Sequence, residues 1–114
     1  MKIGEISKRT NIPISTIRFY DSQQLIPPAY MRRLENQQRD FTEDAIPFLI
    51  KIHNVIKAGV LIEELKSLVN PDPTPEVIQQ QVNLIKQNIE LITEKQANLQ
   101  EAKSFLSSLL NERD

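Results

Sequence analysis

The feature that most constrains this chain is an apolar seam that repeats with heptad spacing through its last third. From residue 78 to residue 110 the seam advances in alternating steps of four and three residues, and eight of its ten positions are apolar. The apolar positions are Ile78, Val82, Ile85, Ile89, Ile92, Leu99, Leu106 and Leu110. This repeat is typical of a coiled-coil helix. We therefore predict one helix from Glu76 to about Asn111, about 54 Å long.

A coiled-coil helix needs a partner, and the rest of the chain is too short to cover the whole stripe. Residues 1–70 can form only one small domain, and three prolines in residues 71–75 separate it from the helix. A second copy of the chain is the economical partner, so we expect a homodimer through residues 76–114. Gln96 and Lys103 interrupt the seam, where they can fix its register; Lys103 can instead extend from its edge toward water.

Two short helical patterns, separated by a turn, open the chain. Their apolar positions are Ile3 and Ile6 in the first pattern and Ile14, Ile17 and Tyr20 in the second. Between them, Asn11 tolerates a left-handed conformation, and Pro13 is compatible only with the first turn of a helix. We therefore predict a helix–turn–helix, with helices at about residues 3–9 and 14–23. In such a motif the second helix enters the major groove of DNA.

The second helix carries polar groups on the side opposite its apolar stripe. Ser15, Thr16, Arg18 and Phe19 lie on or near that side. Hydroxyl groups and arginine are among the side chains that read base edges in the major groove. Short amphipathic helix pairs are common in other proteins too, so this pattern indicates DNA binding only together with its neighbours.

Residues 28–41 lack helical periodicity and contain three arginines, Arg32, Arg33 and Arg39. A guanidinium can bind phosphate through two hydrogen bonds, which gives three arginines in one irregular segment a physical use. We predict a two-stranded hairpin, or wing, that reaches over the DNA backbone. A charged surface loop is the alternative interpretation.

Two further helices complete the front of the chain. Thr42-Glu43-Asp44 has the form of a helix start, a hydroxyl cap followed by acids. Pro47 would fall near the fifth helical position, so it should kink the first turn or move the start later. This helix belongs to the core and ends at Ala58-Gly59, and a short helix follows at about Leu61 to Val69. We expect His53, the only histidine, to be structural.

Charge is distributed unevenly along the chain. Residues 1–60 hold nine lysines and arginines against six acids, which gives +3, and residues 61–114 hold five against nine, which gives −4. A basic front and an acidic rear suit a protein that presents one face to DNA. A solvated surface with uneven charge is the alternative.

Composition argues against several functional classes. Zero cysteines exclude disulfides and thiolate metal sites. No paired carboxylates with a base, no Ser/His/Asp set and no glycine-rich phosphate loop occur, so we expect neither an enzyme nor a cofactor or metal. No apolar run approaches the ~20 residues that a membrane span needs. The first residues lack a secretory core, and we expect a cytoplasmic protein.

Several separated motifs resemble the MerR family of transcriptional regulators. They are residues 3–10 (IGEISKRT), 16–21 (TIRFYD), 25–28 (LIPP), 39–41 (Arg, any residue, aromatic) and 58–65 (AGVLIEEL). Their order and spacing make the resemblance specific over residues 1 to about 70. It implies a mostly all-α fold, with a winged helix-turn-helix DNA-binding domain at 1–70, a proline-rich linker at 71–75 and a dimerising coiled-coil helix at 76–114.

The resemblance also implies roles for individual residues. Arg18 would be the main contact of the recognition helix, and Arg39 would clamp a phosphate from the wing. Phe19 and Tyr20 occupy the family's paired-tyrosine positions, one touching the DNA backbone and the other partly in the core, and Phe19 lacks the hydroxyl group. The predicted DNA-binding residues are Ser15, Thr16, Arg18, Phe19, Tyr20, Arg32, Arg33 and Arg39.

The chain departs from the family pattern at its turns. Asn11, Gln24 and Gln37 replace turn glycines, and Pro13 and Leu61 replace serines that cap helices. Asparagine adopts positive φ more cheaply than glutamine does. The turn after the second helix and the wing tip are therefore the places where we expect the backbone to be rebuilt.

Together these features predict a homodimeric DNA-binding transcriptional regulator that binds a dyad-symmetric operator. The resemblance further implies an antiparallel coil, and a dimer that distorts an over-long promoter spacer so that RNA polymerase can engage it. A protein-interaction adaptor and an excisionase-like architectural DNA protein are the alternatives.

Many members of the resembled family carry an effector domain or a metal-binding loop after the coil. Here the chain stops at Asp114, and without cysteines we expect no metal sensing. The operator, the effector and the choice between activation and repression remain open at this point.

Overall fold

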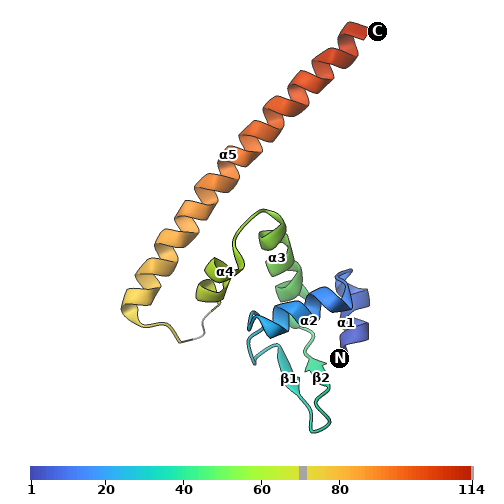
Figure 1. The fold of residues 1–114 in the computed structure, drawn as a ribbon, viewed down its shortest axis with the longest axis vertical. Helices are drawn as coiled ribbons and strands as arrows, with labels where there is room; N and C mark the ends of the chain where they lie inside the picture. Colours follow the sequence, from blue (N-terminus) through green and yellow to red (C-terminus); the bar gives the residue numbers. More distant parts are fainter. Residues whose placement is uncertain (70–71, 114) are drawn as a thin grey trace. The chain divides into compact units, whose positions relative to one another are not determined.

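The computed structural model describes residues 1–69 and 72–113, in two compact units, Met1–Pro73 and from Thr74 onward. We call the first unit the head. Its elements are α1 (Ile3–Thr10), α2 (Ile14–Ser22), β1 (Met31–Arg33), β2 (Arg39–Phe41), α3 (Ala45–Lys57) and α4 (Ile62–Leu68) (Figure 1). The second unit is one helix, α5 (Pro75–Arg113). The predicted mostly helical fold with a hairpin wing is confirmed. Asn70, Pro71 and Asp114, which our predicted boundaries include, lie outside the described residues.

The core of the head forms where α1 packs on α2, α3 and β2. Ile6, Ile17 and Leu49 come from the three helices and are fully buried, as are Ile12 from the turn after α1 and Leu25 from the loop after α2. Ile6, Ile17 and Leu49 are apolar positions that helical periodicity places on one face of each helix. The core therefore fixes how α2 is presented to a partner.

The turn between α1 and α2 is tight and held by side chains. Asn11 adopts a left-handed conformation with φ 59°. The Ser7 hydroxyl donates to the Ile12 carbonyl at 2.6 Å, and the Ile12 N–H donates to the Thr10 hydroxyl oxygen at 3.3 Å. Polar groups around the buried Ile12 are thus satisfied locally, and the predicted helix–turn–helix is confirmed.

The wing, residues 31–41, is an antiparallel pair in which Met31 faces Phe41 and Arg33 faces Arg39. The Phe41 N–H also donates to the Met1 carbonyl at 2.7 Å, so the start of the chain lies along β2. Met31 and Phe41 are buried. One end of the hairpin therefore belongs to the core, and the opposite end carries the turn.

The third helix begins later than Thr42. It starts at Ala45, whose N–H donates to the Thr42 carbonyl at 3.1 Å, and Asp44 makes no side-chain cap. Pro47 is consequently the third helical residue, where a missing N–H costs nothing because the first turn has no acceptors for it. The predicted shift of the start is confirmed, and the proposed Thr42 cap is wrong.

The fourth and fifth helices begin in different ways. Leu61 has no acceptor to cap α4, but its N–H donates to the Glu64 carboxylate at 3.3 Å. Before α5, the Thr74 hydroxyl accepts the Val77 N–H at 3.3 Å. Pro75, predicted to lie in the linker, is instead the first residue of α5, a position where its missing N–H is harmless. Nowhere in residues 1–69 or 72–113 is a helix long and apolar enough to cross a membrane.

The two turn glutamines retain the conformation that glycine favours. Gln24 has φ 59° and Gln37 has φ 67°. The expected rebuilding of these turns is therefore wrong, and both side chains carry the steric cost of a left-handed backbone, about 1 kcal/mol each.

Replacing both residues, Gln24→Gly and Gln37→Gly, is expected to stabilise the head by about 1 kcal/mol in total. The relief of strain exceeds the extra chain entropy of glycine in the unfolded state by about 0.5 kcal/mol per site. The expected rise in melting temperature is about 4–8 °C. Gln23→Gly, at a residue with φ −87°, is the control and should lower stability. A lower melting temperature for the double variant would contradict the strain assignment.

Candidate nucleic-acid interface

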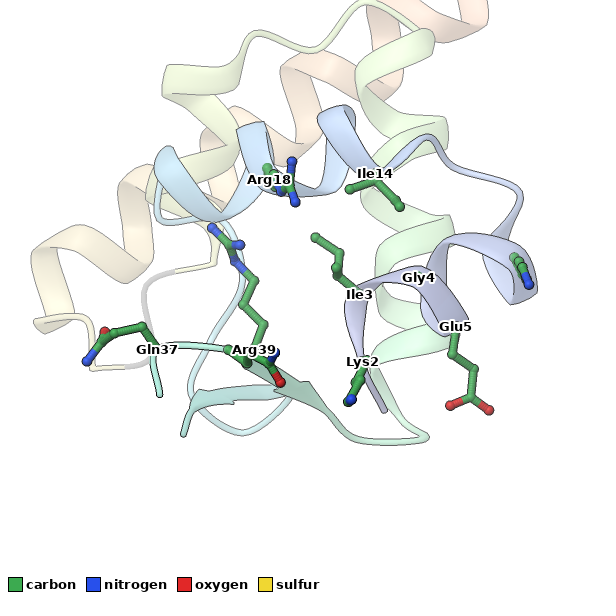
Figure 2. A pocket seen from close by; sticks show the side chains of 10 residues that line it. Lys2, Ile3, Gly4, Glu5, Ile14, Arg18, Gln37 and Arg39 are labelled. Carbon is green, nitrogen blue, oxygen red and sulfur yellow. The ribbon is translucent and has the colours of Figure 1, made fainter. Parts of the chain in front are cut away.

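A cleft of about 780 Å³ opens between the start of α1, one face of α2 and the wing. Its lining residues are Lys2, Ile3, Gly4, Glu5, Lys8, Ile14, Arg18, Gln37, Gln38 and Arg39. Figure 2 shows Arg18 on α2 and Arg39 extending from β2 toward that helix. Four of the lining side chains are cationic and one is acidic, so the cleft has a net positive charge. A concave basic surface beside an exposed helix face suits a polyanion.

The predicted recognition residues lie on the exposed side of α2. Ser15 and Arg18 are exposed, and Thr16 is half-buried. The Arg18 guanidinium has no hydrogen-bond or ion-pair partner within residues 1–69 and 72–113. An arginine that is solvated and unpaired can turn both edges of its guanidinium toward a ligand. Ile14, predicted to be part of the buried stripe, is 36% exposed and lines the cleft instead.

The two adjacent aromatic residues of α2 have opposite environments. Phe19 is 46% exposed, which leaves its ring available for apolar contact. Tyr20 is only 3% exposed, and a hydrogen bond of 2.7 Å joins its hydroxyl to Nδ1 of His53 on α3. Burial raises the pKa of the Tyr20 hydroxyl. Tyr20 is therefore a core residue, and this environment argues against the predicted contact between its side chain and DNA. The structural role predicted for His53 is confirmed.

Two wing arginines are held by one carboxylate of α2. Asp21 Oδ2 accepts from Arg39 Nε at 2.7 Å and from a terminal nitrogen of Arg33 at 2.9 Å. Arg33 also donates to the Gln37 carbonyl across the wing turn at 3.0 Å. The predicted free phosphate clamp at Arg39 is thus an ion-paired side chain, only 18% exposed. Arg33 is likewise occupied on both terminal nitrogens.

The third wing arginine is more available. Arg32 is 76% exposed and reaches Asp40 only at 3.4 Å. Asp40 is bound more closely by the Met1 amine at 2.9 Å. The hydrogen bond from that amine, reinforced by its charge and by Arg32, lowers the pKa of the Asp40 carboxyl. Arg32 therefore remains the wing cation best exposed to a phosphate.

Several functional candidates carried no sequence signal of their own. Lys2, Lys8, Gln37 and Gln38 reach the cleft only because α1 and the wing meet there. Asp21 was visible as part of a motif, but its two partners lie 12 and 18 residues away. Within residues 1–69 and 72–113, no three His, Asp or Glu side chains gather as metal ligands would.

The seam of α5 forms a second candidate site. Its apolar side chains remain largely open: Ile85 is 45% exposed, Ile89 57%, Leu99 70% and Leu110 67%. No residue of α5 is buried. An exposed apolar stripe with only two polar interruptions along a 39-residue helix is unusual in a monomeric protein, and it is typical of a surface for another polypeptide.

The sequence is similar to those of known regulatory proteins. A family model described as "MerR family regulatory protein" matches residues 2–41, the segment that contains α1, α2 and the wing. The HTH-type transcriptional regulator ZntR homolog of Haemophilus influenzae is 31% identical over 85 residues, which are 75% of this chain and 62% of that protein. The HTH-type transcriptional regulator CueR of Salmonella typhi is 27% identical over 110 residues, 96% of this chain and 77% of that protein. The chain therefore spans less than two thirds of the first relative.

A solved structure shares the same architecture. It is HiNmlR, described as a MerR family regulator lacking the sensor domain and bound to promoter DNA. The TM-score is 0.79 at 20% sequence identity, over 96% of this chain and 86% of that one. At this identity the likeness establishes the fold.

Proposed function

We propose that this chain, which resembles MerR family regulatory proteins over residues 2–41, is a transcriptional regulator and not an enzyme, and that it binds promoter DNA as a homodimer. In this proposal α2 enters the major groove and the wing lies over the flanking backbone. The observation that carries the proposal is Arg18, exposed and unpaired on α2 in a cleft that it shares with wing residues. The DNA-bound state of HiNmlR, a protein of the same fold, also supports it.

The roles of the predicted residues follow from their environments. Arg18 is assigned to a base edge, most suitably guanine, because a free guanidinium matches two acceptors there. Ser15 and Thr16 lie beside it and hydrogen-bond bases or phosphates, and Phe19 makes apolar contact. Arg32 binds phosphate, while Arg33 and Arg39 act from positions set by Asp21. Tyr20 is not part of the proposed interface.

The dimer is proposed to form through the α5 seam. A two-stranded coil buries all eight apolar seam positions, which are predominantly exposed in the single chain. A two-fold axis then relates the heads, and the operator is expected to have the same dyad symmetry. Distortion of the promoter spacer, engagement of RNA polymerase and action in the cytoplasm complete the proposal. No effector is proposed.

Selection of bound duplexes from a random DNA pool tests this function. We expect an enriched dyad-symmetric site whose half-sites read alike. Besides Arg18, which is assigned to a base, each protomer has four cations that line or flank the interface and can contact phosphates. They are Lys2, Lys8, Arg32 and Arg39. The binding constant should then fall with salt with a log–log slope of about −7 for the dimer.

A confirmed dimer that enriches no sequence at low salt, and whose weak DNA binding has a flat salt slope, would overturn the DNA-binding assignment. The head would then be better explained as a module that binds another protein.

A further inference from the structure

The wing contains a repulsive pair at the strand ends nearest its turn. Arg33 is the last residue of β1, Arg39 is the first of β2, and the two are direct cross-strand partners. Like charges placed directly opposite each other on a hairpin destabilise it. A two-stranded hairpin of three residues per strand has little stability of its own to oppose this repulsion.

Asp21 compensates that repulsion from outside the hairpin. One carboxylate oxygen accepts from both guanidiniums, at 2.7 Å from Arg39 and 2.9 Å from Arg33. The Asp21 side chain is 14% exposed and that of Arg39 is 18% exposed, so this pair is shielded from water and salt more than an ordinary surface pair. A single residue of α2 therefore attaches both wing strands to the recognition helix.

The ion pair of Arg39 can orient this side chain for phosphate binding, in addition to stabilising the wing. The Asp21 carboxylate accepts a hydrogen bond from Nε of Arg39. The Arg39 side chain also lines the cleft that contains Arg18. An arginine held through Nε has its terminal nitrogens fixed in direction, and a pre-oriented donor loses less entropy when it binds phosphate. The distance between the base-reading arginine and the backbone-binding wing is then set within the protein.

We propose that Asp21 is a positioning residue that fixes the wing arginines relative to α2 and thereby sets the register of the wing on DNA. The proposal rests on the function proposed above. Specific binding needs that register because phosphate contacts orient the protein on the duplex. Non-specific binding depends on total charge and does not need it. Loss of Asp21 should consequently reduce specificity more than overall affinity.

The first test uses the free protein, before any DNA is added. In a nitrogen-15 spectrum, the Arg39 Nε–H should be resolved and exchange slowly with water, because it donates to a shielded carboxylate. Asp21→Asn should increase its exchange rate at least about tenfold. Glu35→Gln, which removes an exposed acid within the wing turn, should leave it unchanged. An equal rate in wild type and Asp21→Asn would overturn the proposed contact.

The second test measures the ratio of affinities for the selected operator and a scrambled duplex. Asp21→Asn is expected to lower this ratio at least about tenfold, with non-specific affinity unchanged or increased. Asp44→Asn is the matched control, since it removes the same charge from an exposed side chain of the head that makes no hydrogen bond or ion pair with the wing. All variants are measured below their melting temperatures, so that loss of folding is excluded.

A double variant keeps the test independent of small losses in stability. Arg39→Ala should lower the specificity ratio in the wild-type background and have little further effect in the Asp21→Asn background. Additive effects would overturn the proposal. Equal ratios for Asp21→Asn and Asp44→Asn, with a wild type that prefers its operator, would overturn this inference alone. A wild type without any operator preference would overturn the proposed function and this inference with it.

Discussion

Chains in which Ile85 and Ile92 are both replaced by glutamate are expected to sediment as monomers. Both residues belong to the apolar α5 seam, so the two substitutions would place four carboxylates in the proposed dimer interface. Each buried and unpaired carboxylate costs about 2 kcal/mol or more. The total of about 8 kcal/mol corresponds to a dimer about a million-fold weaker. Analytical ultracentrifugation over a range of concentrations measures this change directly.

A matched control distinguishes the effect of placing glutamate in the seam from the effect of adding negative charge to the helix. Gln80 and Gln87 are exposed residues that occupy the side of the heptad opposite the seam. The double variant Gln80→Glu and Gln87→Glu adds the same number of carboxylates and should remain dimeric. Circular dichroism should show less helix in the seam variant alone, because a long helix without a partner is only marginally stable in water. A seam variant that stayed dimeric would show that the interface lies elsewhere.

Arg18→Ala is expected to weaken specific DNA binding strongly while leaving the dimer intact. Loss of one arginine–base pair costs about 1–3 kcal/mol, and a symmetric dimer loses it in both half-sites. The combined loss of about 2–6 kcal/mol corresponds to an operator affinity between about 30-fold and about 20,000-fold weaker. A titration of fluorescent operator duplex, with sedimentation of the same sample, measures both quantities.

Lys51→Ala provides the control for Arg18→Ala. Lys51 is an exposed cation on α3 that does not line the cleft. Its loss changes net charge by the same amount and should weaken specific and non-specific binding only slightly and equally. An Arg18→Ala variant with unchanged operator affinity would contradict the recognition-helix assignment and would favour the adaptor interpretation.

The helices of this protein were predictable because each depends mainly on local rules. Apolar periodicity located α1, α2 and α3, and the heptad seam located α5, with bounds that differ by a few residues. The larger differences occur at helix starts. Pro47 and Pro75 both lie in first turns, where proline is acceptable. Thr74 was not recognised as a cap because its cluster of prolines suggested a break.

At the two glutamine turns, the local conformational cost of a residue does not predict the backbone conformation that is observed. Gln24 and Gln37 adopt left-handed conformations that glutamine disfavours. The surrounding helices and strands require the chain to reverse within these residues, and the core is worth more than about 1 kcal/mol of local strain. Local backbone preference alone predicts rebuilt turns, because it leaves out the packing energy of the rest of the fold.

The location of the candidate DNA interface was predictable from the sequence, but the ion pairs among its residues were not. Periodicity alone assigned Tyr20 to the buried stripe of α2, and the structure agrees with that assignment rather than with a DNA contact. The ion pairs of Asp21 could not be foreseen, because they join α2 to two strands whose placement depends on the complete fold. Arginine counts in the sequence therefore overstated the number of free cations.

The contact between Tyr20 and His53 has a mechanical consequence. It joins the last turn of α2 to α3, one turn beyond the buried Ile17, so the recognition helix is anchored at two points along its length. Tilting α2 independently of α3 would break this hydrogen bond and disturb the packing around Ile17. We therefore expect such heads to adapt little when they bind half-sites at an unfavourable separation. Bending the duplex over 20–30 base pairs costs about 1–6 kcal/mol, and in the proposed complex the DNA would take up that work.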